Sequence, residues 1–236
     1  MADNVTYQSA APATPAAGDV IAAQDVGGVK YQEVIVHGLT GDETYKGLRI
    51  DATTHSVQTI SYEHHEIHSG SSFTVFNQDD SVASAAGLSF SFKTPNTAKL
   101  IHLIVECMSS GESITTLLET ASSTADGDGE VAVVPVNRQR DSGGATTLLE
   151  DTTTGSFDTV GVTKYPESVG IGDHPTGTTI DVISAGSGNK GGGAARGHEE
   201  FVLARNTVYG IVMLSKAAAN AMILKLDWYE HTQRTA

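Results

Sequence analysis

Within residues 221–231, large apolar side chains recur with a period of two. The even positions from 222 to 228 are apolar, whereas Lys225 and Asp227 occupy odd positions. Only an extended strand sends successive side chains to opposite faces, so this segment must cover a core with one face only. A chain with such an element needs partner strands to complete a sheet. The apolar positions are Met222, Leu224, Leu226 and Trp228.

Strand signals recur along the rest of the chain, which predicts an all-β protein. Residues 99–108 are nearly all apolar and predict a central strand buried on both faces. Pro135 predicts that its segment, residues 131–136, is an edge strand, because proline cannot donate a backbone hydrogen bond. A helical period appears only weakly, in residues 114–121. About ten strands with irregular loops predict a jelly-roll β-sandwich. The remaining strand segments are residues 31–36, 57–68, 71–77, 88–92, 131–136, 178–184, 199–204 and 208–215.

The composition predicts two parts of unequal size. Residues 1–28 are rich in Ala, Pro, Thr and Asp and contain no Lys or Arg. They read either as a flexible leader or as an extended arm that docks on a neighbouring subunit. Residues 29–236 predict one jelly-roll domain with a Gly/Ser/Thr-rich loop excursion near residues 137–198. A short ribbon is expected within it at residues 157–165.

Charge and cysteine usage narrow the class of protein. The formal net charge of −14 argues against contact with nucleic acid, which needs Lys and Arg at the phosphates, and against an anionic membrane. The single cysteine, Cys107, lies in an apolar run and is expected to be a buried strand residue. Residues 1–4 lack the basic start of a signal peptide. We therefore expect synthesis in a reducing cytosol.

Residues 63–70 carry three histidines and two glutamates. Because β-branched and aromatic residues flank them, we expect a strand, with His64, Glu66 and His68 on one face. His64 and His68 would then be about 13 Å apart, too far for one ion. The His-x-His spacing of cupins, which are metal-binding jelly rolls, is missing. We expect a polar contact ladder between subunits with pH-sensitive histidines, and His64, Glu66 and His68 stay as a minor, partial metal-site alternative.

Two other motifs carry weaker signals. Residues 186–191 match the dinucleotide-binding glycine pattern, but a strand-like segment follows where a helix is needed, so a loop is expected. Residues 126–130 alternate acidic side chains as a calcium loop does, but an EF-hand would need Gly and Glu where Val131 and Asn137 stand. A turn is expected there. We therefore predict no catalytic residue, no cofactor and no enzyme.

Two stretches resemble structural proteins of tailed bacteriophages. The first is residues 54–60 running into residues 63–70. The second begins with residues 201–203, continues through Asn206, Thr207 and Tyr209, and ends at residues 226–230. The resemblance implies a jelly-roll virion protein of the capsid decoration (cement) or head-fibre type that assembles as a homotrimer.

That resemblance implies a role and a location. The expected partner is the major capsid protein, and the expected site is the outer surface of the mature head after synthesis in the bacterial host cytoplasm. Two alternatives stay open. One is a neck, tail or fibre subunit that binds the host surface, for which Phe157 and Tyr165 are the aromatic residues in the excursion. The other is a cupin-like metal-dependent enzyme.

Overall fold

The computed structural model describes strands within residues 1–61 by their backbone, and then residues 62–122, 129–151, 156–167, 171–186 and 200–232. The chain divides into two compact units, Met1–Thr59 and Ile60–Ala236. The first unit holds a three-stranded antiparallel sheet and a separate two-stranded one. In the larger sheet, the strand at residues 19–26 pairs with the strand at residues 29–32, so the pair extends across residue 28. The domain boundary predicted after residue 28 stays a prediction. These strands are β1 (Asp3–Tyr7), β2 (Asp19–Val26), β3 (Val29–Gln32), β4 (His37–Leu39) and β5 (Tyr45–Gly47).

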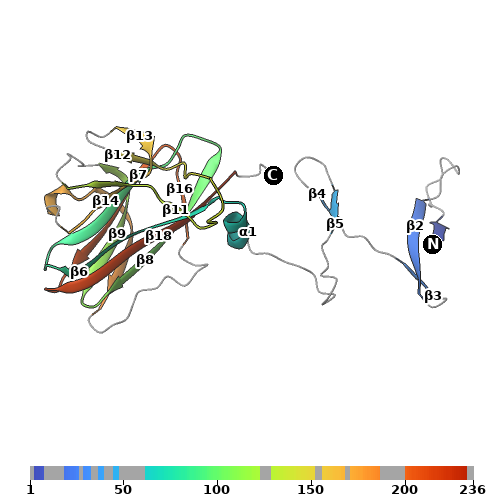
Figure 1. The fold of residues 1–236 in the computed structure, drawn as a ribbon, viewed down its shortest axis with the longest axis horizontal. Helices are drawn as coiled ribbons and strands as arrows, with labels where there is room; N and C mark the ends of the chain where they lie inside the picture. Colours follow the sequence, from blue (N-terminus) through green and yellow to red (C-terminus); the bar gives the residue numbers. More distant parts are fainter. Residues whose placement is uncertain are drawn as a thin grey trace. The chain divides into compact units, whose positions relative to one another are not determined.

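The second unit consists of two antiparallel sheets and one short helix (Figure 1). The helix is α1 (Tyr62–His68), and a single 3₁₀ turn, η1 (Ile171–Asp173), comes shortly before the strand that begins at Thr176. One sheet has the order β11-β6-β18-β8-β16. Its strands are β11 (Val136–Asn137), β6 (Ser72–Val82), β18 (Asn220–Thr232), β8 (Lys99–Ser109) and β16 (Phe201–Leu203).

The other sheet has the order β10-β14-β7-β17-β9-β15, and β12 and β13 join it beside β7. Its main strands are β10 (Val131–Val133), β14 (Val162–Tyr165), β7 (Gly87–Lys93), β17 (Val208–Ser215), β9 (Ser113–Ser122) and β15 (Thr176–Ala185). The two added strands are β12 (Leu149–Asp151) and β13 (Phe157–Val160).

The connectivity is that of a jelly roll. Taken in chain order, the eight framework strands are β6, β7, β8, β9, β15, β16, β17 and β18. The first, eighth, third and sixth lie side by side in one sheet, and the second, seventh, fourth and fifth in the other. This interleaving of the two ends of the chain is the double Greek key of the jelly roll. The predicted fold class is therefore confirmed.

The core fills the space between the two sheets with apolar side chains. The even positions of β18 face inward as the alternation predicts, and the Trp228 ring stacks on Phe73 with centroids 5.8 Å apart. Burying each such side chain stabilises the fold by about 1.5–3 kcal/mol. The largest fully buried residues are Trp228, Tyr165, Tyr209, Phe73, Phe90, Phe92, Leu88, Ile101, Leu103, Leu148, Ile211 and Met213.

Three strand predictions need correction in detail. Residues 114–121 lie in β9, so the weak helical period there was misleading. Strand β8 is central, but only its odd positions enter the core; on its other face His102 is half-buried and Met108 is exposed. The segment 131–136 divides at Pro135 into β10 and β11, which are edge strands of opposite sheets. Proline has no backbone N–H to donate to a neighbouring strand, so it fits the point where the chain passes from one sheet to the other.

The long excursion is inserted between β9 and β15 and carries β10 to β14. It widens both sheets, because β14 pairs with β7 and β11 pairs with β6. The expected ribbon at residues 157–165 is not a hairpin: β13 pairs with β12, whereas β14 pairs with β7 and β10. Much of this excursion is thus part of the sandwich.

A buried carboxyl in the excursion, Glu150, gives a first testable prediction. Its side chain lies in β12, 5% exposed, and burial raises its pKa. A raised pKa means that the charged form costs stability above the ordinary pKa of a glutamate. Replacing Glu150 by Gln should therefore raise the melting temperature at pH 8 by about 2–4 °C, with a smaller gain at pH 4.5. Glu112→Gln, at an exposed turn position, is the matched control and should change little; an equal gain there would contradict the prediction.

Candidate functional site

The histidine-rich run is a helix. Residues 57–68 were predicted to be a strand, and this is wrong for α1. The helix ends at His68, and Gly70, whose φ of 76° is left-handed, stops it from continuing. Its amide donates to the Ile67 carbonyl at 3.1 Å, and the Ser71 amide donates to the Glu66 carbonyl at 3.0 Å. These two bonds form a Schellman cap. Seven residues are too few for an isolated helix, so its packing on β18 and β6 must stabilise it.

The helix rearranges the three candidate residues of the contact ladder. His64 and His68 are four residues apart and share an exposed side, with their Nε2 atoms 3.1 Å apart rather than about 13 Å. Glu66 is buried, 6% exposed, and accepts a bond of 3.1 Å from the Ser69 hydroxyl. His64, Glu66 and His68 therefore do not share one face. Their role in subunit contacts stays a prediction.

A second histidine cluster, which the sequence did not predict, lies on the outward face of β18 and β8. His102 on β8 stands opposite Tyr229 on β18, and their rings stack with centroids 4.5 Å apart. The His231 ring lies 4.4 Å from the His102 ring. Glu200, just before β16, accepts a 2.7 Å bond from the Tyr229 hydroxyl and also bonds Nδ1 of His102. We call His102, Glu200, Tyr229 and His231 the outer-sheet cluster.

The electrostatics of the outer-sheet cluster favour a neutral His231. Burial lowers the pKa of His231, and the neighbouring His102 lowers it further, although Glu66 and Glu200 act in the opposite direction. Burial also lowers the pKa of His174, while the adjacent Asp173 raises it. Both imidazoles therefore take up protons less readily in the folded protein than in the unfolded chain.

Acid should destabilise the sandwich through these two histidines. Because their folded pKa lies below the ordinary value of about 6.5, their contribution is complete above that pH and is lost as the pH falls from there through the lower folded pKa. We expect the unfolding free energy, measured by urea titration, to fall from pH 7.5 to pH 5.5. His231→Gln should flatten this dependence. An unchanged slope in the His231 variant would contradict the assignment.

Two groups that could suggest nucleophilic chemistry are built into the fold. The Ser89 hydroxyl lies 2.7 Å from Nδ1 of His174, but both side chains are at most 3% exposed. Cys107 is 1% exposed within the core, as predicted from its apolar surroundings. Neither group is open to a substrate from solvent, because all three side chains are at most 3% exposed. Their burial makes them structural.

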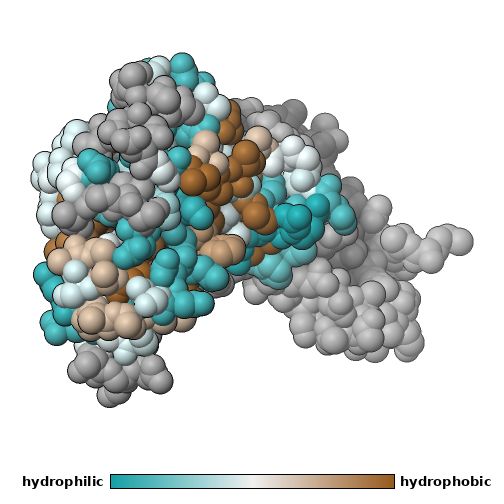
Figure 2. Space-filling view, turned by 60° about the vertical axis from the view of Figure 1, so that its left-hand side comes forward, coloured by the Kyte–Doolittle hydropathy of each residue, from teal (hydrophilic) through white to brown (hydrophobic). Residues whose placement is uncertain are grey.

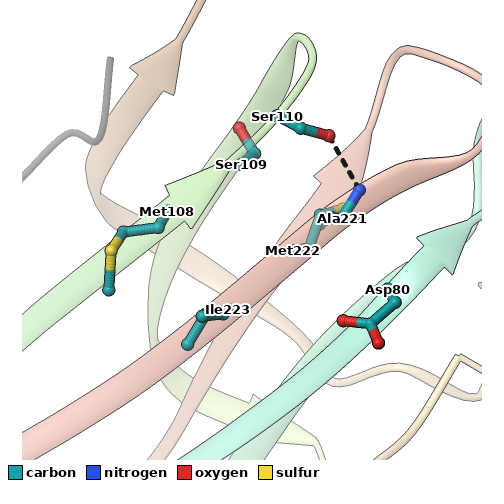
Figure 3. Close-up of a pocket in the computed structure, with 7 residues that line it drawn as sticks. All are labelled: Asp80, Met108, Ser109, Ser110, Ala221, Met222 and Ile223. Atoms are coloured by element: carbon teal, nitrogen blue, oxygen red, sulfur yellow. Dashed lines mark hydrogen bonds between the residues drawn. The ribbon is translucent and has the colours of Figure 1, made fainter. Parts of the chain in front are cut away.

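One open hollow of about 280 Å³ lies on the outward side of the β6-β18-β8 strands (Figure 3). Met108, Ile223 and Asp80 line it from three adjacent strands. Its hydroxyls are already used: Ser109 donates to the Gly111 carbonyl at 2.7 Å, and Ser110 accepts from the Ala221 amide at 2.9 Å. The hollow therefore offers apolar contact rather than reactive groups.

The same outward face mixes charge with exposed apolar side chains. Lys225 bridges Glu106 and Asp227 at 3.0 and 2.7 Å. Burial alone would lower its pKa, but the bonds to both carboxylates outweigh this and raise it. Phe76 on β6 and Val202 on β16 are exposed on either side of the β18–β8 pair. Surface areas of this mixed kind can be seen in Figure 2, where brown hydrophobic residues lie among teal hydrophilic ones.

Several predicted motifs cannot be placed or have changed meaning. Most of residues 126–130 and 186–191 lie outside the described residues. Of the two aromatics considered for host binding, Tyr165 is fully buried and bonded to the Ser91 hydroxyl at 3.1 Å, and Phe157 is half-buried. Among the described residues, no group of three or more His, Cys, Asp or Glu could hold a metal ion.

Comparisons with protein-family models, curated proteins and solved structures find no match to this chain. Within the described residues, no helix has the length and apolar character needed to cross a bilayer.

Proposed function

We propose that the chain is a non-enzymatic virion structural protein: a capsid decoration protein that binds the outer surface of the mature phage head as a homotrimer and stabilises it. The observation that carries this proposal is the jelly-roll sandwich whose interior is filled by side chains. Such a domain can bind partners through the outer faces of its sheets. The sequence resemblance to phage structural proteins and the net charge of −14, which favours solubility at the outside of a particle, support it.

The packed interior also weighs against the cupin-like enzyme. Cupins hold a metal between their sheets, where this protein has Trp228, Phe73 and Phe90. Every histidine whose side chain the structure describes lies outside the core cluster between the two sheets. For the host-binding alternative, the burial of Tyr165 removes one of the two aromatics on which it depended.

Decoration would stabilise the head by mass action. A protein that binds the assembled shell but not its separated subunits favours the shell by an amount that grows with its concentration. Residues 1–28, which lie within the compact unit Met1–Thr59, are our candidate for the part that reaches an adjacent subunit. The sandwich would then supply the trimer contacts.

Truncation of the first unit tests this arrangement. A chain lacking residues 1–25 should lose at least about tenfold in affinity for heads built from the major capsid protein encoded with it, while light scattering still reports a trimer. Cosedimentation with heads measures the affinity. An untruncated chain taken through the same purification is the control. Unchanged occupancy of the heads would remove the arm from the binding role, and failure of the full chain to sediment with heads would contradict decoration itself.

A further inference from the structure

His64 and His68 form a chelating arrangement on the exposed side of α1. Their Nε2 atoms lie 3.1 Å apart, and their ring centroids are separated by 4.6 Å with a tilt of 43°. One turn of helix sets this spacing, since residues i and i+4 lie above one another. Both side chains are exposed, so an ion can approach from solvent.

The separation matches two imidazoles on one ion. With metal–nitrogen bonds of about 2.05 Å, two ligand atoms are about 3.3 Å apart at a tetrahedral angle and about 2.9 Å apart at a right angle. The observed 3.1 Å lies between these values. We propose that His64 and His68 bind one divalent transition-metal ion, such as Zn²⁺, Ni²⁺ or Cu²⁺, through their Nε2 atoms.

The neighbouring groups define what kind of site this is. Glu66 points to the other side of the helix and is bonded to Ser69, and Nδ1 of His65 lies 3.4 Å from the Glu66 carboxylate. Among the described residues no third His, Cys, Asp or Glu joins the pair, so the two imidazoles define the site. Two imidazole ligands suit borderline transition metals and disfavour Mg²⁺ or Ca²⁺, which require oxygen ligands. The proposal is independent of the virion role.

Binding exchanges a proton for the metal. Without metal, one Nε2–H donates to the other Nε2 across the 3.1 Å contact, so the pair shares a hydrogen bond. Both nitrogens must be unprotonated to coordinate, so the ion displaces this proton and the imidazole that carried it adopts its other tautomer or exchanges with solvent. Acid should therefore weaken binding, and coordination should hold the last turn of α1 in place.

Calorimetric titration of the full chain with ZnCl₂ and NiCl₂ at pH 7.5 tests the proposal. We expect about one ion per chain at this site, and His64→Gln or His68→Gln should each lower its affinity at least about tenfold, because the second imidazole acts at high effective concentration. His65→Gln, in the same helix, is the matched control and should keep wild-type affinity. Ca²⁺ should not bind at the site.

Thermal unfolding gives an independent readout. Zn²⁺ in excess should raise the melting temperature of the wild type and of the His65 variant, and not that of the His64 or His68 variant. Without metal, circular dichroism should show all four proteins folded alike, because these side chains are exposed. Absence of binding to the wild type, or full affinity in the His64 and His68 variants, would overturn the proposal.

Discussion

Replacing Glu230 by Ala should destabilise the sandwich by about 3–5 kcal/mol, because it removes a buried carboxylate and leaves its donors unpaired. Glu230 is 1% exposed at the end of β18. It accepts bonds from the Thr146 hydroxyl at 2.6 Å and from the Thr147 amide and hydroxyl at 2.9 and 2.7 Å. Nζ of Lys99 lies 3.9 Å away. One side chain thus fastens the long excursion to the framework. Denaturant unfolding measures the loss.

Two further variants make this test decisive. Glu230→Gln keeps the shape but removes the charge, so an intermediate loss of about 1–3 kcal/mol is expected. Glu112→Ala, at an exposed position, should stay within about 0.5 kcal/mol of wild type. If the alanine variant does not fold, hydrogen exchange in the glutamine variant should show weaker protection at residues 146–148. An alanine variant within about 1 kcal/mol of wild type would contradict the fastening role.

Replacing Asn220 by Asp should cost about 2–4 kcal/mol at neutral pH, although it changes one atom. At the start of β18, Oδ1 of Asn220 accepts from the Gly111 amide at 2.6 Å and from the Ser110 hydroxyl at 3.1 Å. Its Nδ2 donates to the Glu112 carbonyl at 3.2 Å and to the Ser215 hydroxyl at 3.1 Å. An aspartate cannot donate, so its charge would face the Glu112 carbonyl.

The pH dependence of this variant separates charge from shape. A protonated carboxyl can donate one bond, so the loss should shrink at pH 4. Asn206→Asp, the same change at an exposed turn position, should stay within about 0.5 kcal/mol of wild type at both pH values. Equal losses of stability in Asn220→Asp and Asn206→Asp would show that the buried Asn220 amide does not hold the turn at residues 110–112 in place.

The sequence predicted those elements whose two faces differ. Strand β17 has the predicted bounds, and the inward face of β18 was correct residue by residue, because a period of two leaves one solution when one face is apolar. Helix α1 was missed because its flanks favour strands and because histidines four apart fit a period of two as well as a helical turn. Gly70 was the available signal, since a glycine after a short run is a typical helix stop.

Other features depend on contacts between distant residues and had no local signal. Glu200 meets His102 and Tyr229 only because β16 pairs with β8 and β8 with β18. Asn220 reaches the turn at residues 110–112 only because the jelly roll places β8 beside β18. Such clusters follow from the topology of the sheets and not from spacing along the chain.

Electron cryo-microscopy of mature heads mixed with the purified chain tests the central claim most directly. The heads should be built from the major capsid protein encoded with this chain, and undecorated heads serve as the reference. Decoration predicts added density on the outer surface, in threefold groups into which the sandwich fits, and heads that withstand heating better than the reference. Density confined to the neck or tail, or no added density at saturating protein, would contradict the proposed function.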